Sequence, residues 1–148
     1  MAGAVTLMAA LAVACGGGDD SSSSSPAATQ AAAADDNDES AVAATLTEWA
    51  IAVDEDRASA GDVTFAVTNA GGVPHELAVV RADGAADALP TAAGLVDESQ
   101  MEVLGRTSQI GGGASEEVTF SLTAGSYVLI CNIPAHYDLG MRIGFTVE

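Results

Sequence analysis

Short segments in which apolar and polar residues alternate recur through the last two thirds of the chain. In residues 63–69, Val, Phe and Val alternate with Thr and Ala, which is the two-residue period of a half-buried strand. Residues 118–122 and 143–147 repeat this alternation, whereas residues 127–131 form the continuous apolar run of a strand covered on both faces. Weaker strand candidates lie at residues 44–53, 75–81 and 101–109.

Turn-forming residues separate most of these segments, and no long segment shows the 3.6-residue period of an amphipathic helix. Seven or eight short strands in residues 42–148 predict an all-β domain, either a two-sheet sandwich or a Greek-key barrel. Residues 82–100 break the strand pattern and predict a long connection with room for a short helical turn. Trp49 and Tyr127 are expected to lie in the core.

The N-terminal region has a different composition. Residues 1–14 are small and apolar and end at Cys15, a run too short to span a bilayer but suited to the core of a signal peptide. The sequence Leu-Ala-Val-Ala before Cys15 resembles a bacterial lipobox and predicts lipidation of that cysteine. The alternatives are an ordinary secretory signal and a buried N-terminal helix. Residues 15–41 lack aromatic and branched aliphatic side chains and predict a disordered acidic tether. The folded domain is then expected at residues 42–148.

Charge and cysteine content exclude several classes of protein. The chain has 21 acidic residues and four basic ones, a net charge of −17, so it has too few cations to bind nucleic acid. Fifteen of the acids and all four Arg belong to the predicted domain, which leaves it with a net charge of −11. This charge favours attraction to a basic partner, or it serves only solubility or adaptation to a salty medium. Two Cys exclude a disulfide-rich scaffold and a four-thiolate metal site.

The candidate chemistry is concentrated just after the apolar run. Cys131, His136 and Met141 follow one another at the spacing Cys-x4-His-x4-Met, and the remaining histidine, His75, begins another predicted strand. A thiolate and two imidazoles form a trigonal donor set, and a thioether is a weak axial donor, which suits copper alternating between two oxidation states. Zinc also accepts Cys and His but seldom Met. Each residue alone has an ordinary packing role, but together they predict a type 1 copper site.

The whole predicted domain resembles the cupredoxins, the small blue copper proteins that include plastocyanin, azurin, rusticyanin and sulfocyanin. The segment from Cys131 to His136, Cys-Asn-Ile-Pro-Ala-His, is similar to the azurin loop, and both four-residue spacings are more similar to rusticyanin and sulfocyanin. The resemblance implies a Greek-key β-sandwich in which His75, Cys131 and His136 bind one copper ion, with Met141 as axial ligand. In plastocyanin and azurin an Asn follows the upstream histidine and braces the ligand loop. Here that residue is Glu76, so we expect another group to replace the brace.

The resemblance also implies a one-electron carrier rather than an enzyme. We expect a monomer anchored outside the cytoplasmic membrane of a bacterial cell through a lipid on Cys15. It would exchange electrons with redox proteins such as a cytochrome or a terminal oxidase. His136 is expected to be the more exposed imidazole and to form the electron-transfer patch with Pro134 and Ala135. The alternative function is a copper storage or delivery module for an oxidase. A nucleophilic pair of Cys131 and His136 would need a third, orienting group, and the sequence offers none.

Overall fold

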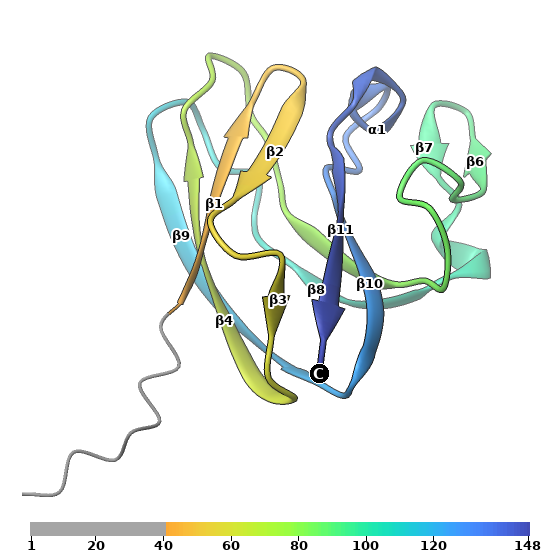
Figure 1. Cartoon of the computed structure of the whole chain (residues 1–148). Helices are drawn as coiled ribbons and strands as arrows, with labels where there is room; N and C mark the ends of the chain where they lie inside the picture. Colours follow the sequence, from red (N-terminus) through yellow and green to blue (C-terminus); the bar gives the residue numbers. More distant parts are fainter. Residues whose placement is uncertain (1–40) are drawn as a thin grey trace, which may run out of the picture. The chain divides into compact units, whose positions relative to one another are not determined.

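Strands make up about half of residues 41–148, the part of the chain that the structure, a computed structural model, describes (Figure 1). The predicted signal peptide, the lipidation site at Cys15 and nearly all of the predicted tether lie outside these residues. The strands are β1 (Val42–Thr47), β2 (Ala50–Val53), β3 (Arg57–Ala58), β4 (Gly61–Asn69), β5 (Ala78–Arg81), β6 (Thr91–Ala92), β7 (Leu95–Val96), β8 (Glu102–Arg106), β9 (Ser115–Leu122), β10 (Gly125–Ile130) and β11 (Arg142–Val147). The helical elements are the 3-10 helix η1 (Glu98–Gln100) and helix α1 (His136–Leu139).

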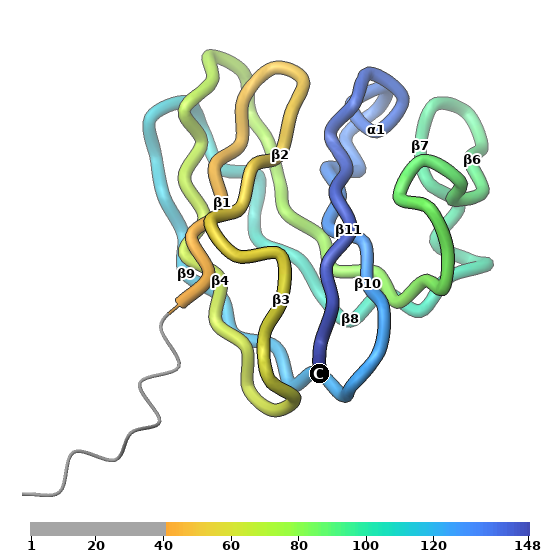
Figure 2. Tube along the Cα trace, in the orientation of Figure 1, coloured from red at the N-terminus to blue at the C-terminus, as the bar shows by residue number. Residues whose placement is uncertain are grey.

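Two sheets form the layers of a sandwich. One has the strand order β2-β1-β4-β9 and the other the order β3-β11-β10-β5-β8. Neighbouring strands are antiparallel except for the pairs β1–β4 and β3–β11. The chain passes from one sheet to the other after β2, β3, β4, β8 and β9, as in Greek-key sandwiches. The predicted all-β Greek-key sandwich is therefore confirmed. The trace in Figure 2 shows the β1–β2 turn and α1 at the same end of the two layers.

Alternation along the strands builds the core between the sheets. In β4 the side chains of Val63, Phe65 and Val67 are buried, and Phe65 has no exposed surface. The Phe65 ring lies 6.3 Å from the ring of Phe120 on its own sheet and 5.3 Å from that of Phe145 on the other, so it joins the two layers. The continuous apolar run of β10 is buried on both faces, as predicted.

The second buried face of β10 packs under the long connection between β5 and β8. Val128 and Ile130 belong to a cluster that includes Leu89 and Val96 from this connection, together with Tyr137. The connection carries two short strands and one turn of 3-10 helix, which agrees with the expected short helical turn. No helix within residues 41–148 has the length and apolar character needed to cross a bilayer.

One weaker strand candidate and one core prediction need correction. Residues 44–53 are not a single strand, because the chain reverses at Glu48 and Trp49 and continues as β2. Trp49 therefore lies at the tip of a hairpin, beyond the buried face of the sheet, and 41% of its surface is exposed. The prediction that it belongs to the core is wrong, whereas Tyr127 is buried as expected.

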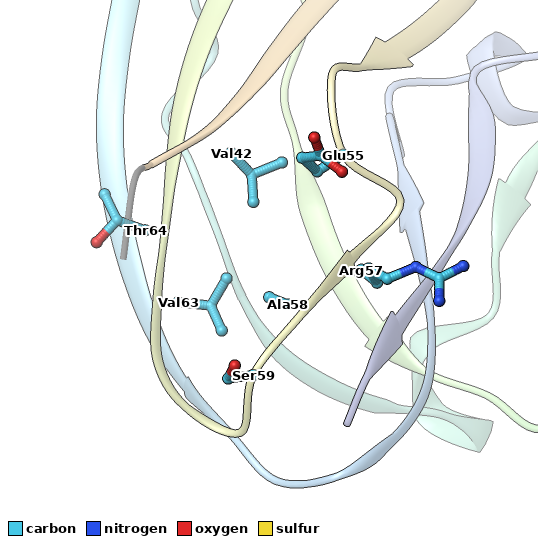
Figure 3. A pocket seen from close by; sticks show the side chains of 7 residues that line it. All are labelled: Val42, Glu55, Arg57, Ala58, Ser59, Val63 and Thr64. Carbon is cyan, nitrogen blue, oxygen red and sulfur yellow. The ribbon is translucent and has the colours of Figure 1, made fainter. Parts of the chain in front are cut away.

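A hollow of about 210 Å³ lies beside β3, where Val42 and Val63 line its apolar side (Figure 3). The cation on its rim, Arg57, is already paired with Asp56 and Glu148 at 3.3 Å each. β3 and the C-terminus lie at the opposite end of the sandwich from α1 (Figure 1). The hollow is therefore separate from the segment that carries the candidate ligands.

Replacing Phe65 by Ala removes the ring that joins the two sheets and leaves a cavity. We expect Phe65→Ala to lower the free energy of unfolding by about 3–5 kcal/mol, measured by urea denaturation of the full chain. Thr45→Ala, at an exposed position of β1, is the control and should cost less than about 1 kcal/mol. Equal losses in the two variants would contradict the role given to Phe65.

Candidate metal centre

The loop between β4 and β5 holds His75 at one end of the sandwich. The backbone of His75 pairs with that of Ile110, with N···O distances of 3.1 and 2.7 Å. Asn69, which is fully buried, donates from Nδ2 to the carbonyls of Val73 and Ile110, each at 2.8 Å, and accepts a hydrogen bond from the amide of Gly71. This Asn side chain thus fixes the loop that carries His75. The sequence pattern did not assign Asn69 a role at the site.

The segment after β10 carries the other candidate ligands and folds back on itself. The amide of Cys131 donates to the carbonyl of Met141 at 3.1 Å, and the amide of Met141 donates to the carbonyl of His136 at 3.0 Å. Gly140 has a φ of 127°, and a Cβ there would lie 2.8 Å from the carbonyl oxygen of Trp49. Only glycine therefore lets the segment turn this closely against the β1–β2 hairpin.

Three of the predicted ligand atoms meet in the interior. The Nδ1 atoms of His75 and His136 are 3.2 Å apart, and Cys131 Sγ is 3.3 Å from Nδ1 of His136. All three candidate ligand atoms lie within 4.8 Å of one another, and all three residues are buried. Bonds of about 2.0 Å to nitrogen and 2.3 Å to sulfur place two ligands of one ion roughly 3–4 Å apart. The spacing therefore fits a single metal ion.

Burial shifts the protonation of all three groups. It lowers the pKa of His75 and of His136, and for His75 the neighbouring imidazole adds to the effect. Burial also raises the pKa of the Cys131 thiol, although the amide of Glu76, 3.4 Å from Sγ, acts in the opposite direction. The metal-free site thus presents neutral imidazoles, ready to donate lone pairs, and a thiol that releases its proton when a metal binds.

The β1–β2 turn places a carboxylate beside His75. Glu48 accepts hydrogen bonds at Oε1 from the amides of Gly72 at 2.7 Å and Val73 at 3.0 Å, which lower its pKa. The same oxygen is 3.8 Å from Nε2 of His75, a buried atom without a hydrogen-bond partner in the described part of the chain. A Cβ at Gly71 would lie 2.7 Å from both carboxylate oxygens, so this glycine makes room for Glu48. Sequence reasoning missed Glu48, because a hairpin tip far upstream gives no sign of this contact.

The neighbouring Trp49 covers the second imidazole. Its ring meets that of His136 edge-on, with the centroids 5.0 Å apart. His136 is more exposed than His75, as expected, but only 8% of its surface is accessible, against 0% for His75. Pro134 and Ala135 are exposed, as their place in the predicted patch requires. The surface beside His136 therefore includes the indole of Trp49, which the sequence pattern did not place there.

The long connection between β5 and β8 holds the ligand segment from its other side. The amide of Ala135 donates to the carbonyl of Gly94 at 2.7 Å, and the amide of Val96 donates to Oδ1 of Asn132 at 2.7 Å. The hydroxyl of Tyr137 accepts from one backbone group of the connection at 3.1 Å and donates to another at 2.8 Å. A segment that breaks the strand pattern thus supports the candidate site.

Comparison with known proteins agrees with this donor set. The family profile described as copper binding proteins of the plastocyanin/azurin family matches residues 30–148. Reduced auracyanin from the photosynthetic bacterium Roseiflexus castenholzii is 24% identical, with 72% of this chain and 94% of that chain covered and a TM-score of 0.53. Auracyanin B is 25% identical, with 73% and 88% covered and a TM-score of 0.53. Reduced rusticyanin is 20% identical, with 72% and 75% covered and a TM-score of 0.56.

A search of curated proteins gave no significant match. The family profile nevertheless covers well over half of the chain, and the solved structures share its fold. The cupredoxin resemblance is thereby confirmed, and the buried cluster of His75, Cys131 and His136 suits one type 1 copper ion as the cofactor. The chain belongs to the plastocyanin/azurin family of copper-binding proteins.

Proposed function

We propose that the protein is a one-electron carrier tethered outside the cytoplasmic membrane, in which His75, Cys131 and His136 bind copper and Met141 is the axial ligand. The observation that carries this proposal is the convergence of two imidazole nitrogens and one thiol sulfur in the interior of a cupredoxin sandwich. When bound, copper supplies a couple between Cu(II) and Cu(I).

The backbone around the site supports rapid electron transfer. His75 is held by its pairing with Ile110 and by the Asn69 side chain, and Cys131 is tied to Met141. Ligands fixed in this way before the metal binds have little freedom to move when the oxidation state changes. A small rearrangement keeps the barrier to electron transfer low.

The axial role of Met141 rests on its position in the fold. Its side chain is fully buried in the same apolar cluster as Cys131. Its backbone is hydrogen-bonded to the backbone of Cys131 and to that of His136. A thioether is a soft and weak donor, and in such a site it tunes the reduction potential more than it holds the metal.

The surface around His136 suits transient contact with a redox partner. Trp49 is 41% exposed and Leu139 is 52% exposed, next to the exposed Pro134 and Ala135. We infer that electrons enter and leave through His136 and the indole packed on it. The net charge of −11 on the domain favours a partner with a basic surface, and a cytochrome or a terminal oxidase is the expected class.

A lipid on Cys15 and the acidic segment of residues 15–41 would hold the domain near the membrane while it reaches its partners.

Burial of the ligands argues against a storage or delivery module. His75 and Cys131 have no exposed surface, so release of the ion needs the ligand segment to open. Slow loss of copper combined with reversible redox cycling distinguishes the carrier from a delivery module.

The copper-loaded protein should be intensely blue and should show the small hyperfine splitting of type 1 copper in paramagnetic resonance. Cys131→Ser removes the thiolate and should abolish the colour, because the absorption arises from charge transfer between sulfur and copper. Cys15→Ser changes the other cysteine of the chain and should leave the spectrum unchanged. A colourless protein that binds only zinc would refute the proposal.

Met141→Leu replaces the thioether by an apolar side chain of similar size. We expect this variant to retain copper and to have a higher reduction potential, because loss of the axial donor disfavours Cu(II). Protein-film voltammetry measures the change. Met101→Leu, at a partly buried position outside the ligand segment, is the matched control. An unchanged or lower potential in Met141→Leu would exclude the axial role.

The single tryptophan of the chain provides an optical test of the location of the site. Because Trp49 packs against His136, Cu(II) bound at the centre should strongly quench its fluorescence. Zn(II), which has the same charge and a closed d shell, should leave most of the emission intact. Titration of the metal-free full chain with each ion measures the difference. Equal emission with both ions would place the bound metal away from Trp49.

A further inference from the structure

A series of four polar side chains runs alongside the metal centre and connects its supporting segments. Arg106 lies between two carboxylates, with Nη1 3.2 Å from Oε1 of Glu76 and Nη2 2.5 Å from Oε2 of Glu98. The other carboxylate oxygen of Glu98 accepts a hydrogen bond from Nδ2 of Asn132 at 2.6 Å. We call these residues the brace network: Glu76, Arg106, Glu98 and Asn132.

Each end of the brace network is one residue away from a proposed ligand. Glu76 follows His75, and its amide N–H points to Cys131 Sγ at 3.4 Å. Asn132 follows Cys131, and its side-chain amide forms two hydrogen bonds with the backbone of Val96, at 2.7 and 3.2 Å. The network therefore ties the loop that carries His75 to the segment that carries Cys131.

Electrostatics explain why these side chains remain together. The side chain of Glu76 is only 8% exposed, and a buried carboxylate without a partner is strongly destabilising. The planar guanidinium of Arg106 can bind two carboxylates at once, which an ammonium group does less well. Arg106 and, to a smaller extent, Asn132 hold the pKa of Glu98 below its ordinary value. The buried Glu76 and the partly exposed Glu98 thus share Arg106 as their partner.

We propose that the brace network positions the Cys131 sulfur by holding the Glu76 amide N–H against it. This inference rests on the proposed copper site. An N–H that donates to the thiolate withdraws electron density from sulfur, weakens its donation to copper and favours the reduced state. The brace network therefore raises the reduction potential and keeps the ligand geometry uniform. Its members act through Cys131 and do not touch the metal.

The test is the double variant Glu76→Gln/Arg106→Gln, which breaks the network without changing the net charge. We expect copper to bind still, with a lower reduction potential and an altered hyperfine splitting. In the metal-free full chain, hydrogen exchange of the backbone amide at position 76 should become about tenfold faster, because a bond to a charged group is lost. Asn132→Ala, which keeps the buried ion pair, should change the same quantities in the same direction.

The control is Arg57→Gln/Glu148→Gln, which removes an exposed Arg–Glu pair of similar length at the other end of the sandwich. It should leave the potential, the resonance spectrum and the exchange rate of the position-76 amide unchanged. If Asn132→Ala and the Glu76/Arg106 variant both match this control, the brace network has no positioning role. If the double variant does not fold, Asn132→Ala decides alone. If the parent protein forms no type 1 site, the proposed function fails, and the exchange rates of the metal-free chains still test the brace.

Discussion

The burial of three metal-ligand atoms next to one another is the constraint on which this end of the sandwich depends. Two imidazole nitrogens and a thiol sulfur lie within 4.8 Å of one another in the interior. Burying a polar group costs free energy unless the group has a hydrogen-bond or metal partner, and one bound copper ion provides a partner for all three atoms. In the metal-free chain, the surrounding backbone has to hold them in place against that cost.

Each support of the site comes from a different part of the chain. Asn69 fixes the loop of His75, the β1–β2 turn places Glu48 and Trp49 against the two imidazoles, and the long connection between β5 and β8 bonds to the ligand segment. Strands of both sheets hold these elements in place, so the ligands move little relative to one another. A rigid donor set suits electron transfer more than metal delivery, which needs the ligands to open.

Local signals in the sequence predict the fold class and the ligand segment, whereas the assignment of His75 comes from the cupredoxin resemblance. Alternation marks the strands, and the spacing of Cys131, His136 and Met141 marks the ligand segment. The supports of the site were not predictable, because contacts between distant segments arise only in the folded chain. The large apolar side chain of Trp49 favours a core position, but the reversal of the chain at the hairpin places it at the surface.

Charges near the site and on the surface have different roles. The negative Glu48 carboxylate lies 3.8 Å from His75 and favours Cu(II) in the proposed site. The amide of Glu76, hydrogen-bonded to Cys131 Sγ, favours Cu(I). Water screens the partly exposed Glu48, but the sulfur is fully buried, so the contact at sulfur should dominate the potential. At physiological salt, the electrostatic field of the remaining surface acids extends roughly 8–10 Å into the solvent. Their effect would therefore be on the approach of the proposed redox partner, and the potential is left to the groups that touch the ligands.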